Sequence, residues 1–169
     1  MNKKAVAQES VWDYPRPPRL EPTPRRVRVL GVGQTIADST SAMRILETSH
    51  PPVYYIPAEQ VNMCLLRRSP SLSTFCEFKG NAIYWTLDIC LLDRQITIPD
   101  VAWSFPAPSP AYARIAGHMA FYASRLAEHD FDCWVDDERV IPQAGDFYGG
   151  WITSNLRGPF KGEPGSHHW

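Results

Sequence analysis

The sequence has no apolar run of the roughly 20 residues that a membrane-spanning helix needs. Its first ten residues carry two lysines with no apolar stretch behind them, unlike a secretory signal peptide. We therefore expect a soluble, cytoplasmic protein with no membrane partner. The 169 residues suit a single domain with extended ends, since domains usually hold about 100–150 residues.

An excess of charge of either sign is also missing. There are 17 basic and 18 acidic residues, and the formal net charge is −1. Protein–nucleic-acid affinity depends heavily on a field of positive charge, and this balance gives no such field over the whole surface. We predict no nucleic-acid partner.

Cysteines are few and unpaired. They stand at Cys64, Cys76, Cys90 and Cys133, and no two of them are close enough for a C-x-x-C metal knuckle or redox pair. In a reducing cytosol such isolated cysteines are usually small apolar core residues. We predict no metal site, and the sequence indicates no particular cofactor.

Proline, in contrast, is abundant, with 16 residues, and five of them cluster between positions 15 and 24. Proline fixes φ and biases the preceding residue toward extended geometry. We predict a polyproline-like arm over residues 1–25, which Trp12 and Tyr14 pin onto the domain. The arm can fold back on its own chain or cross to a neighbour, and a homodimer stays an open alternative.

The rest of the chain has the pattern of a mainly β domain. Apolar runs on either side of residues 31–33 and 136–138 predict two hairpins. Further strands are predicted at residues 53–56, 73–78, 82–92, 95–98, 101–105 and 147–153, and short helical turns at residues 39–47, 58–66 and 111–119. We assign the core domain to residues 26–142. Residues 143–169 are expected to pack on it as a C-terminal extension with a Gly/Pro-rich tail.

Several distinctive segments follow one another between residues 27 and 140. They are ETSHPPVYYIP (47–57), TFCEFKG (74–80), AIYW (82–85), AWSFP (102–106), IAGHMAFY (115–122) and VDDERV (135–140). Together they resemble the domain of unknown function 427 family, which also carries a provisional nucleotidyltransferase label. The resemblance implies a compact two-sheet domain of the β-tent (Mss4-like) kind. Zinc-binding members of that architecture use paired cysteine knuckles, and zinc is not carried over to this sequence.

Four polar residues in the most distinctive region are candidates for chemistry. Arg44 and Glu47 are three residues apart and would share a face of the helical turn predicted there. A histidine beside a carboxylate suits general acid–base catalysis near neutral pH, and we assign that role to His50 and Glu47. Arg44 and Lys79 would bind a phosphate or carboxylate. The alternative is that Arg44 and Glu47 form a surface ion pair while His50 only caps the turn.

Aromatic side chains are candidates for the walls of a pocket. We assign Tyr55, Trp85 and Trp103 to ligand binding, although aromatic residues in so small a domain also serve the core. Cys76 would be reactive if a turn at Gly80 brings it beside Lys79.

The best functional hypothesis is binding of a small anionic metabolite or nucleotide, with general acid–base catalysis by His50 and Glu47 as an added hypothesis. The alternative is a non-catalytic module that binds a protein or peptide through aromatic and proline surfaces. That alternative requires an accessible Trp103.

Overall fold

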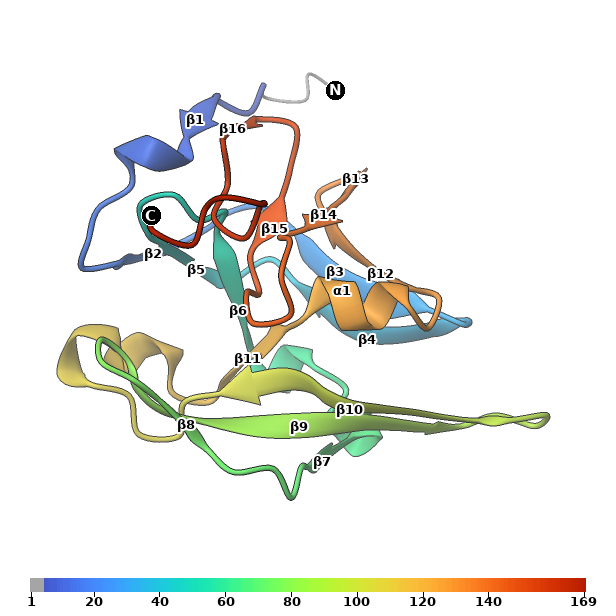
Figure 1. Ribbon diagram of the computed structural model, residues 1–169. Helices are drawn as coiled ribbons and strands as arrows, with labels where there is room; N and C mark the ends of the chain where they lie inside the picture. Colours follow the sequence, from blue (N-terminus) through green and yellow to red (C-terminus); the bar gives the residue numbers. More distant parts are fainter. Residues whose placement is uncertain (1–4) are drawn as a thin grey trace.

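The computed structural model describes residues 5–169, and the fold is mainly β (Figure 1). Strands make up 43% of it and helices 12%, which confirms the mainly β prediction. The β-tent (Mss4-like) likeness stays a prediction. Within residues 5–169, no helix is long and apolar enough to cross a membrane.

The largest sheet is curled and contains eight strands. Its order is β2-β5-β6-β11-β10-β9-β7, and β8 also pairs with β9. The bounds are β2 Arg19–Pro22, β5 Met43–Leu46, β6 Val53–Pro57, β7 Leu66–Arg68, β8 Thr74–Cys76, β9 Gly80–Cys90, β10 Gln95–Ser104 and β11 His118–Phe121. In Figure 1, β9 and β10 run together as a long hairpin along one side of the molecule.

Strand β10 joins two predicted strands, residues 95–98 and 101–105, into one. The register against β9 shifts between Ile98 and Ala102, and Asp100 has a φ of 50° at this point. Pro99 has no N–H to donate to a ladder, and an irregularity of this kind lets a long strand continue past it. The strand bends here and carries Trp103 onward to the interior.

A second sheet has the order β13-β12-β3-β4. Its strands are β3 Val27–Gly31, β4 Gln34–Ser39, β12 Phe131–Val135 and β13 Glu138–Arg139. Both predicted hairpins are present. At the first turn Val32 and Gly33 have φ values of 46° and 75°, the left-handed geometry that tight hairpins require. Both sheets contribute to the main core, which includes Val29, Ile36, Ile56, Leu87, Phe121 and Phe131.

The helical turn predicted at residues 39–47 is wrong, because the chain forms strand β5 there. Ala42, Ile45 and Leu46 have helical spacing in the sequence, but Met43 and Ile45 are both buried on either side of Arg44. This alternation suits a strand between β2 and β6. Arg44 and Glu47 therefore do not share a helical face.

The other predicted helical turns are partly present. Residues 58–66 contain two 3₁₀ turns, Ala58–Gln60 and Met63–Leu65, where one brief helix was expected. The 3₁₀ segment Pro110–Ile115 ends before β11 begins at His118. The sequence pattern does not predict α1 (Ala123–Ala127), whose single turn and a half is too short to show a helical period.

The N-terminal arm folds onto its own chain. Strand β2 forms the edge of the large sheet, and β1 (Glu9–Ser10) pairs in parallel with β16 (Leu156–Arg157). A 3₁₀ turn, Val11–Asp13, follows β1. Tyr14 is buried, whereas the Trp12 indole is 41% exposed and donates to the Pro159 carbonyl at 2.8 Å. The homodimer stays an open alternative.

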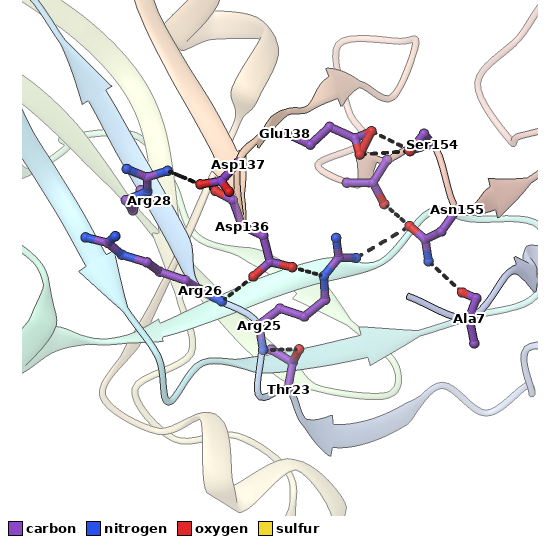
Figure 2. A network of polar contacts seen from close by, with 11 residues as sticks. Ala7, Thr23, Arg25, Arg26, Arg28, Asp136, Asp137, Glu138, Ser154 and Asn155 are labelled. Atoms are coloured by element: carbon purple, nitrogen blue, oxygen red, sulfur yellow. Dashed lines mark hydrogen bonds and ion pairs between the residues drawn. The ribbon is translucent and has the colours of Figure 1, made fainter. Parts of the chain in front are cut away.

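The C-terminal extension returns across the domain, and its strand β15 (Trp151–Ile152) pairs with β14 (Ile141–Pro142), which comes just before the extension. A polar network ties it to the second hairpin and to the arm (Figure 2). Arg25 donates to Asp136 at 2.8 Å and to Asn155 at 3.4 Å, and Asn155 donates to the Ala7 carbonyl at 3.2 Å. Three segments distant in the sequence are thereby fixed together.

Arg44 holds the arm against the sheet. Its guanidinium donates to both oxygens of Glu9, at 3.0 and 3.1 Å, and to Glu21 at 2.8 Å. Tyr14 also donates to Glu9, at 2.5 Å. Burial opposes the charge of Glu9, but the hydrogen bonds from Arg44 and Tyr14 outweigh it and hold the pKa of that carboxyl below its usual value.

We predict that Arg44→Met lowers the free energy of unfolding by about 2–3 kcal/mol, because two partly buried carboxylates lose their charged donor. Urea unfolding measures the change. The matched control is Arg19→Met, since Arg19 is 54% exposed and its ion pair with Glu21 spans 3.4 Å. Its cost should stay below about 1 kcal/mol. If the two variants lose the same free energy of unfolding, Arg44 does not hold the arm against the sheet.

Candidate functional site

A cavity of about 620 Å³ opens between the large sheet and the C-terminal extension. Strands β5, β6, β8, β9 and β10 supply one side through residues such as Ile45, Tyr55 and Ala82. Residues after position 142 supply another, including Gln143, Tyr148 and Lys161. Its volume lies within the usual range for small-molecule sites.

Aromatic side chains form much of the lining. They are Tyr55, Phe75, Phe78, Tyr84, Trp103, Phe105, Tyr122, Phe147, Tyr148 and Trp169. Those on the inner side belong to the second apolar core, so one cluster both stabilises the domain and shapes the cavity.

Trp103 lies at the centre of this inner group. Its ring centroid is 4.4 Å from that of Tyr122 and 6.4 Å from that of Tyr55, and its Nε1–H donates to the Tyr55 hydroxyl at 3.3 Å. Only 8% of Trp103 is exposed. Burial of this residue removes the sequence-based support for a peptide-binding module centred on it.

Gly149 allows the C-terminal extension to approach Trp103. A Cβ placed on Gly149 would lie 2.1 Å from the nearest indole carbon, well inside van der Waals contact. Because glycine has no Cβ, the backbone at Gly149 can lie directly against the Trp103 ring. This contact joins the extension to the sheet at the wall of the cavity.

His50 and Glu47 lie together at the cavity, at the end of β5. The backbone at Ser49, with a φ of 71°, is held by hydrogen bonds to Val11 and from Lys161. His50 Nδ1 lies 2.9 Å from the Thr48 carbonyl and 3.4 Å from Glu47 Oε2. Glu47 in turn accepts from Arg16 at 3.1 Å.

This geometry determines the tautomer and charge of His50. A carbonyl only accepts, and Nδ1 must therefore carry the proton, which leaves the lone pair of the neutral ring on Nε2. Burial lowers the pKa of His50, with Arg16 and Lys161 acting in the same direction, and outweighs the opposing effects of Thr48 and Glu47. His50 is therefore neutral near pH 7 and suited to accept a proton.

Lys79 contributes a cation with no counter-ion in contact. Within residues 5–169, its ammonium has no hydrogen bond and no carboxylate within 4.0 Å, and it lies 5.7 Å from the Phe105 ring centroid. Burial opposes its charge, but the anionic forms of Tyr55 and Cys76 and the Glu47 carboxylate outweigh burial and raise the pKa of Lys79. The ammonium therefore stays charged at neutral pH.

Lys161 is a different kind of lysine. It is 7% exposed, and its ammonium donates to the backbone oxygens of Ser166 and Trp169 at 2.7 and 3.2 Å. These bonds fold the tail against the cavity. The turn before Gly80 does bring Cys76 and Lys79 to the same cavity, as the sequence allows.

The structure brings five of the predicted site residues together and leaves two apart. Those that line the cavity are Glu47, His50, Lys79, Tyr55 and Trp103. Arg44 lies outside the lining and is bound to Glu9 and Glu21, where it holds the arm. Trp85 also lies outside the lining, and its indole donates to Ser104 at 3.0 Å.

Sequence reasoning missed the cavity residues Arg16, Tyr148 and Lys161. They come from the arm and from the extension, which no periodic pattern connects to Glu47 and His50. Within residues 5–169, no group of three or more His, Cys, Asp or Glu side chains is arranged to hold a metal ion.

The fold and the cavity define a small β domain with an aromatic-lined site that carries a His–Glu pair and a lysine with no carboxylate partner among residues 5–169. The family model described as a domain of unknown function (DUF427) matches residues 19–137. The chain belongs to this family, in agreement with the resemblance of its sequence. No curated protein matches the chain. The cavity wall formed after residue 142 lies outside the matched range.

We predict that stability depends on pH through His50. Because burial lowers the folded-state pKa below that of the unfolded chain, the unfolded chain binds more protons as the pH falls below about 6.5. The free energy of unfolding should therefore rise as the pH is raised to about 7, and this rise should be smaller in His50→Gln. Urea unfolding between pH 5 and 8 measures it.

The matched control is His118→Gln. His118 Nδ1 makes the same local contact, 3.1 Å from the Ala116 carbonyl two residues earlier, but it lies outside the cavity. The pH profile of His50→Gln is compared with that of His118→Gln, which also lacks one imidazole. An unchanged profile in His50→Gln would show that His50 does not lose its proton on folding.

Proposed function

We propose that the cavity binds a small anionic metabolite or nucleotide, whose charge is held by Lys79. The observation that carries the proposal is a charged ammonium that lines a cavity of ligand size, with no carboxylate of the described part of the chain in contact. An anionic ligand would give this ammonium a counter-ion in a partly desolvated site, where attraction between opposite charges is stronger than in water. Aromatic walls supply apolar contact for the rest of the ligand.

General acid–base chemistry on the bound ligand is the second part of the proposal. His50 has its Nε2 lone pair available, and Glu47 and the Thr48 carbonyl hold the opposite side of the ring. Arg16 keeps Glu47 in place. A neutral histidine oriented in this way by a carboxylate is a suitable general base near neutral pH.

We predict that a panel of organic acids, sugar phosphates and nucleotides contains an anion that raises the melting temperature. A ligand at about 100 times its Kd adds roughly 2.7 kcal/mol, which corresponds to about 5–10 °C for a domain of this size. Lys79→Met should remove the shift, and Lys79→Arg should keep part of it.

Arg94→Met is the control for net charge, because Arg94 is exposed and lies in the turn after β9, away from the cavity. It should leave the shift unchanged. If no anion gives a shift that depends on Lys79, the proposed function is wrong. If a ligand is found, His50→Gln should retain its binding while any turnover is lost.

A protein- or peptide-binding role is favoured by one observation. Phe75 and Phe147 line the cavity and are each 74% exposed, although they are large apolar side chains. Pull-down capture that survives Lys79→Met but is lost in Phe75→Ser with Phe147→Ser would favour this second function.

A further inference from the structure

The charges around the cavity limit the charge of its ligand. Among the described residues of the lining, Arg16, Lys79 and Lys161 are cationic, and Glu47 and Glu77 are carboxylates. Arg16 forms an ion pair with Glu47 at 3.1 Å. The ammonium of Lys161 donates hydrogen bonds to the main-chain oxygens of Ser166 and Trp169. Among these cations of the lining, the ammonium of Lys79 is left to meet a ligand.

The surroundings of Lys79 limit the shape of the ligand. Its ammonium lies 5.7 Å from the centre of the Phe105 ring, and Phe105 packs on Tyr55, with their ring centroids 6.4 Å apart. A ligand whose anionic end reaches Lys79 therefore places its neighbouring atoms against aromatic rings. A flat apolar body suits these walls better than a strongly hydrated one.

The rim of the cavity extends the apolar surface outward. Phe75, on β8, and Phe147, in the C-terminal extension, both line the cavity and remain largely exposed. An apolar ligand body would cover part of each ring. The rim and the interior thus favour the same chemistry, although Phe75 and Phe147 are about 70 residues apart in the sequence.

Polyphosphates fit this arrangement poorly. A phosphate monoester already carries about −1.5 to −2 charges near pH 7, and a nucleoside triphosphate carries more. With one available ammonium, the excess charge would be desolvated without partners, which is unfavourable. Many phosphate sites use the backbone N–H groups of a glycine-rich loop. In this lining, the space beside Gly149 is occupied by the Trp103 ring.

We propose that the ligand is a monoanion with a flat apolar body, of the class of aromatic monocarboxylates, and that nucleoside polyphosphates are excluded. The carboxylate pairs with Lys79 and the ring lies against Phe105 and Trp103. This inference rests on the function proposed above, and it names the ligand class for that same cavity.

Isothermal titration calorimetry on the full chain tests it, with phenylacetate and indole-3-acetate as probes. Phenylacetamide is the neutral control of the same shape, and ATP and pyrophosphate are the polyanions. We expect at least one monocarboxylate to bind at least tenfold more tightly than phenylacetamide. Lys79→Met should remove that difference, and Phe147→Ser should weaken binding about threefold. ATP and pyrophosphate should show no binding that depends on Lys79.

Failure of this inference can be told apart from failure of the proposed function. Binding of ATP or pyrophosphate that depends on Lys79, without binding of either monocarboxylate, would overturn the ligand class and leave the anion site in place. Equal affinities for phenylacetate, indole-3-acetate and phenylacetamide would overturn charge recognition by Lys79, and with it both proposals. The comparison of acid with amide uses the wild-type protein, so it does not depend on the folding of a variant.

Discussion

The contact between the Trp103 indole and Gly149 is the constraint on which the cavity depends. Trp103 belongs to the large sheet and is held by Tyr55 and Tyr122, whereas Gly149 belongs to the C-terminal extension. The missing Cβ lets the extension lie directly on the indole. The same extension brings Tyr148 into edge contact with His50, with ring centroids 5.6 Å apart, and places Lys161 and Phe147 in the lining of the cavity.

A second constraint separates structural charges from available ones. Most ionic groups around the cavity and the arm already have partners: Arg44 holds Glu9 and Glu21, Arg16 holds Glu47, and Arg25 holds Asp136. Lys79 differs because its nearby groups are aromatic rings, a thiol and a more distant carboxylate. A positive charge kept under these conditions is more informative about ligand binding than any of the paired arginines.

The sequence predicts the mainly β fold, the two hairpins and the nearness of Glu47 and His50, because each depends on local pattern or short separation. It misplaces Arg44, because the spacing of Ala42, Ile45 and Leu46 fits a helix as well as a strand, and pairing with β2 and β6 decides the outcome. It also misses Arg16, Tyr148 and Lys161. Their positions depend on how the arm and extension return to the sheet, which local pattern does not encode.

The pKa of His50 is lowered and that of Lys79 is raised, so the first favours the neutral form and the second the charged form. This difference supports different roles for the two residues. Burial keeps His50 neutral, while Lys79 stays charged because neighbouring groups outweigh burial. A neutral base and a fixed cation in one cavity can act on the same molecule, since the cation binds the anionic end and the base accepts a proton elsewhere. Were both groups charged, His50 could not act as a base, and a monoanion would leave an excess positive charge in the site. The two pKa directions therefore suit the two roles proposed for these residues, a base and a cation that binds an anion.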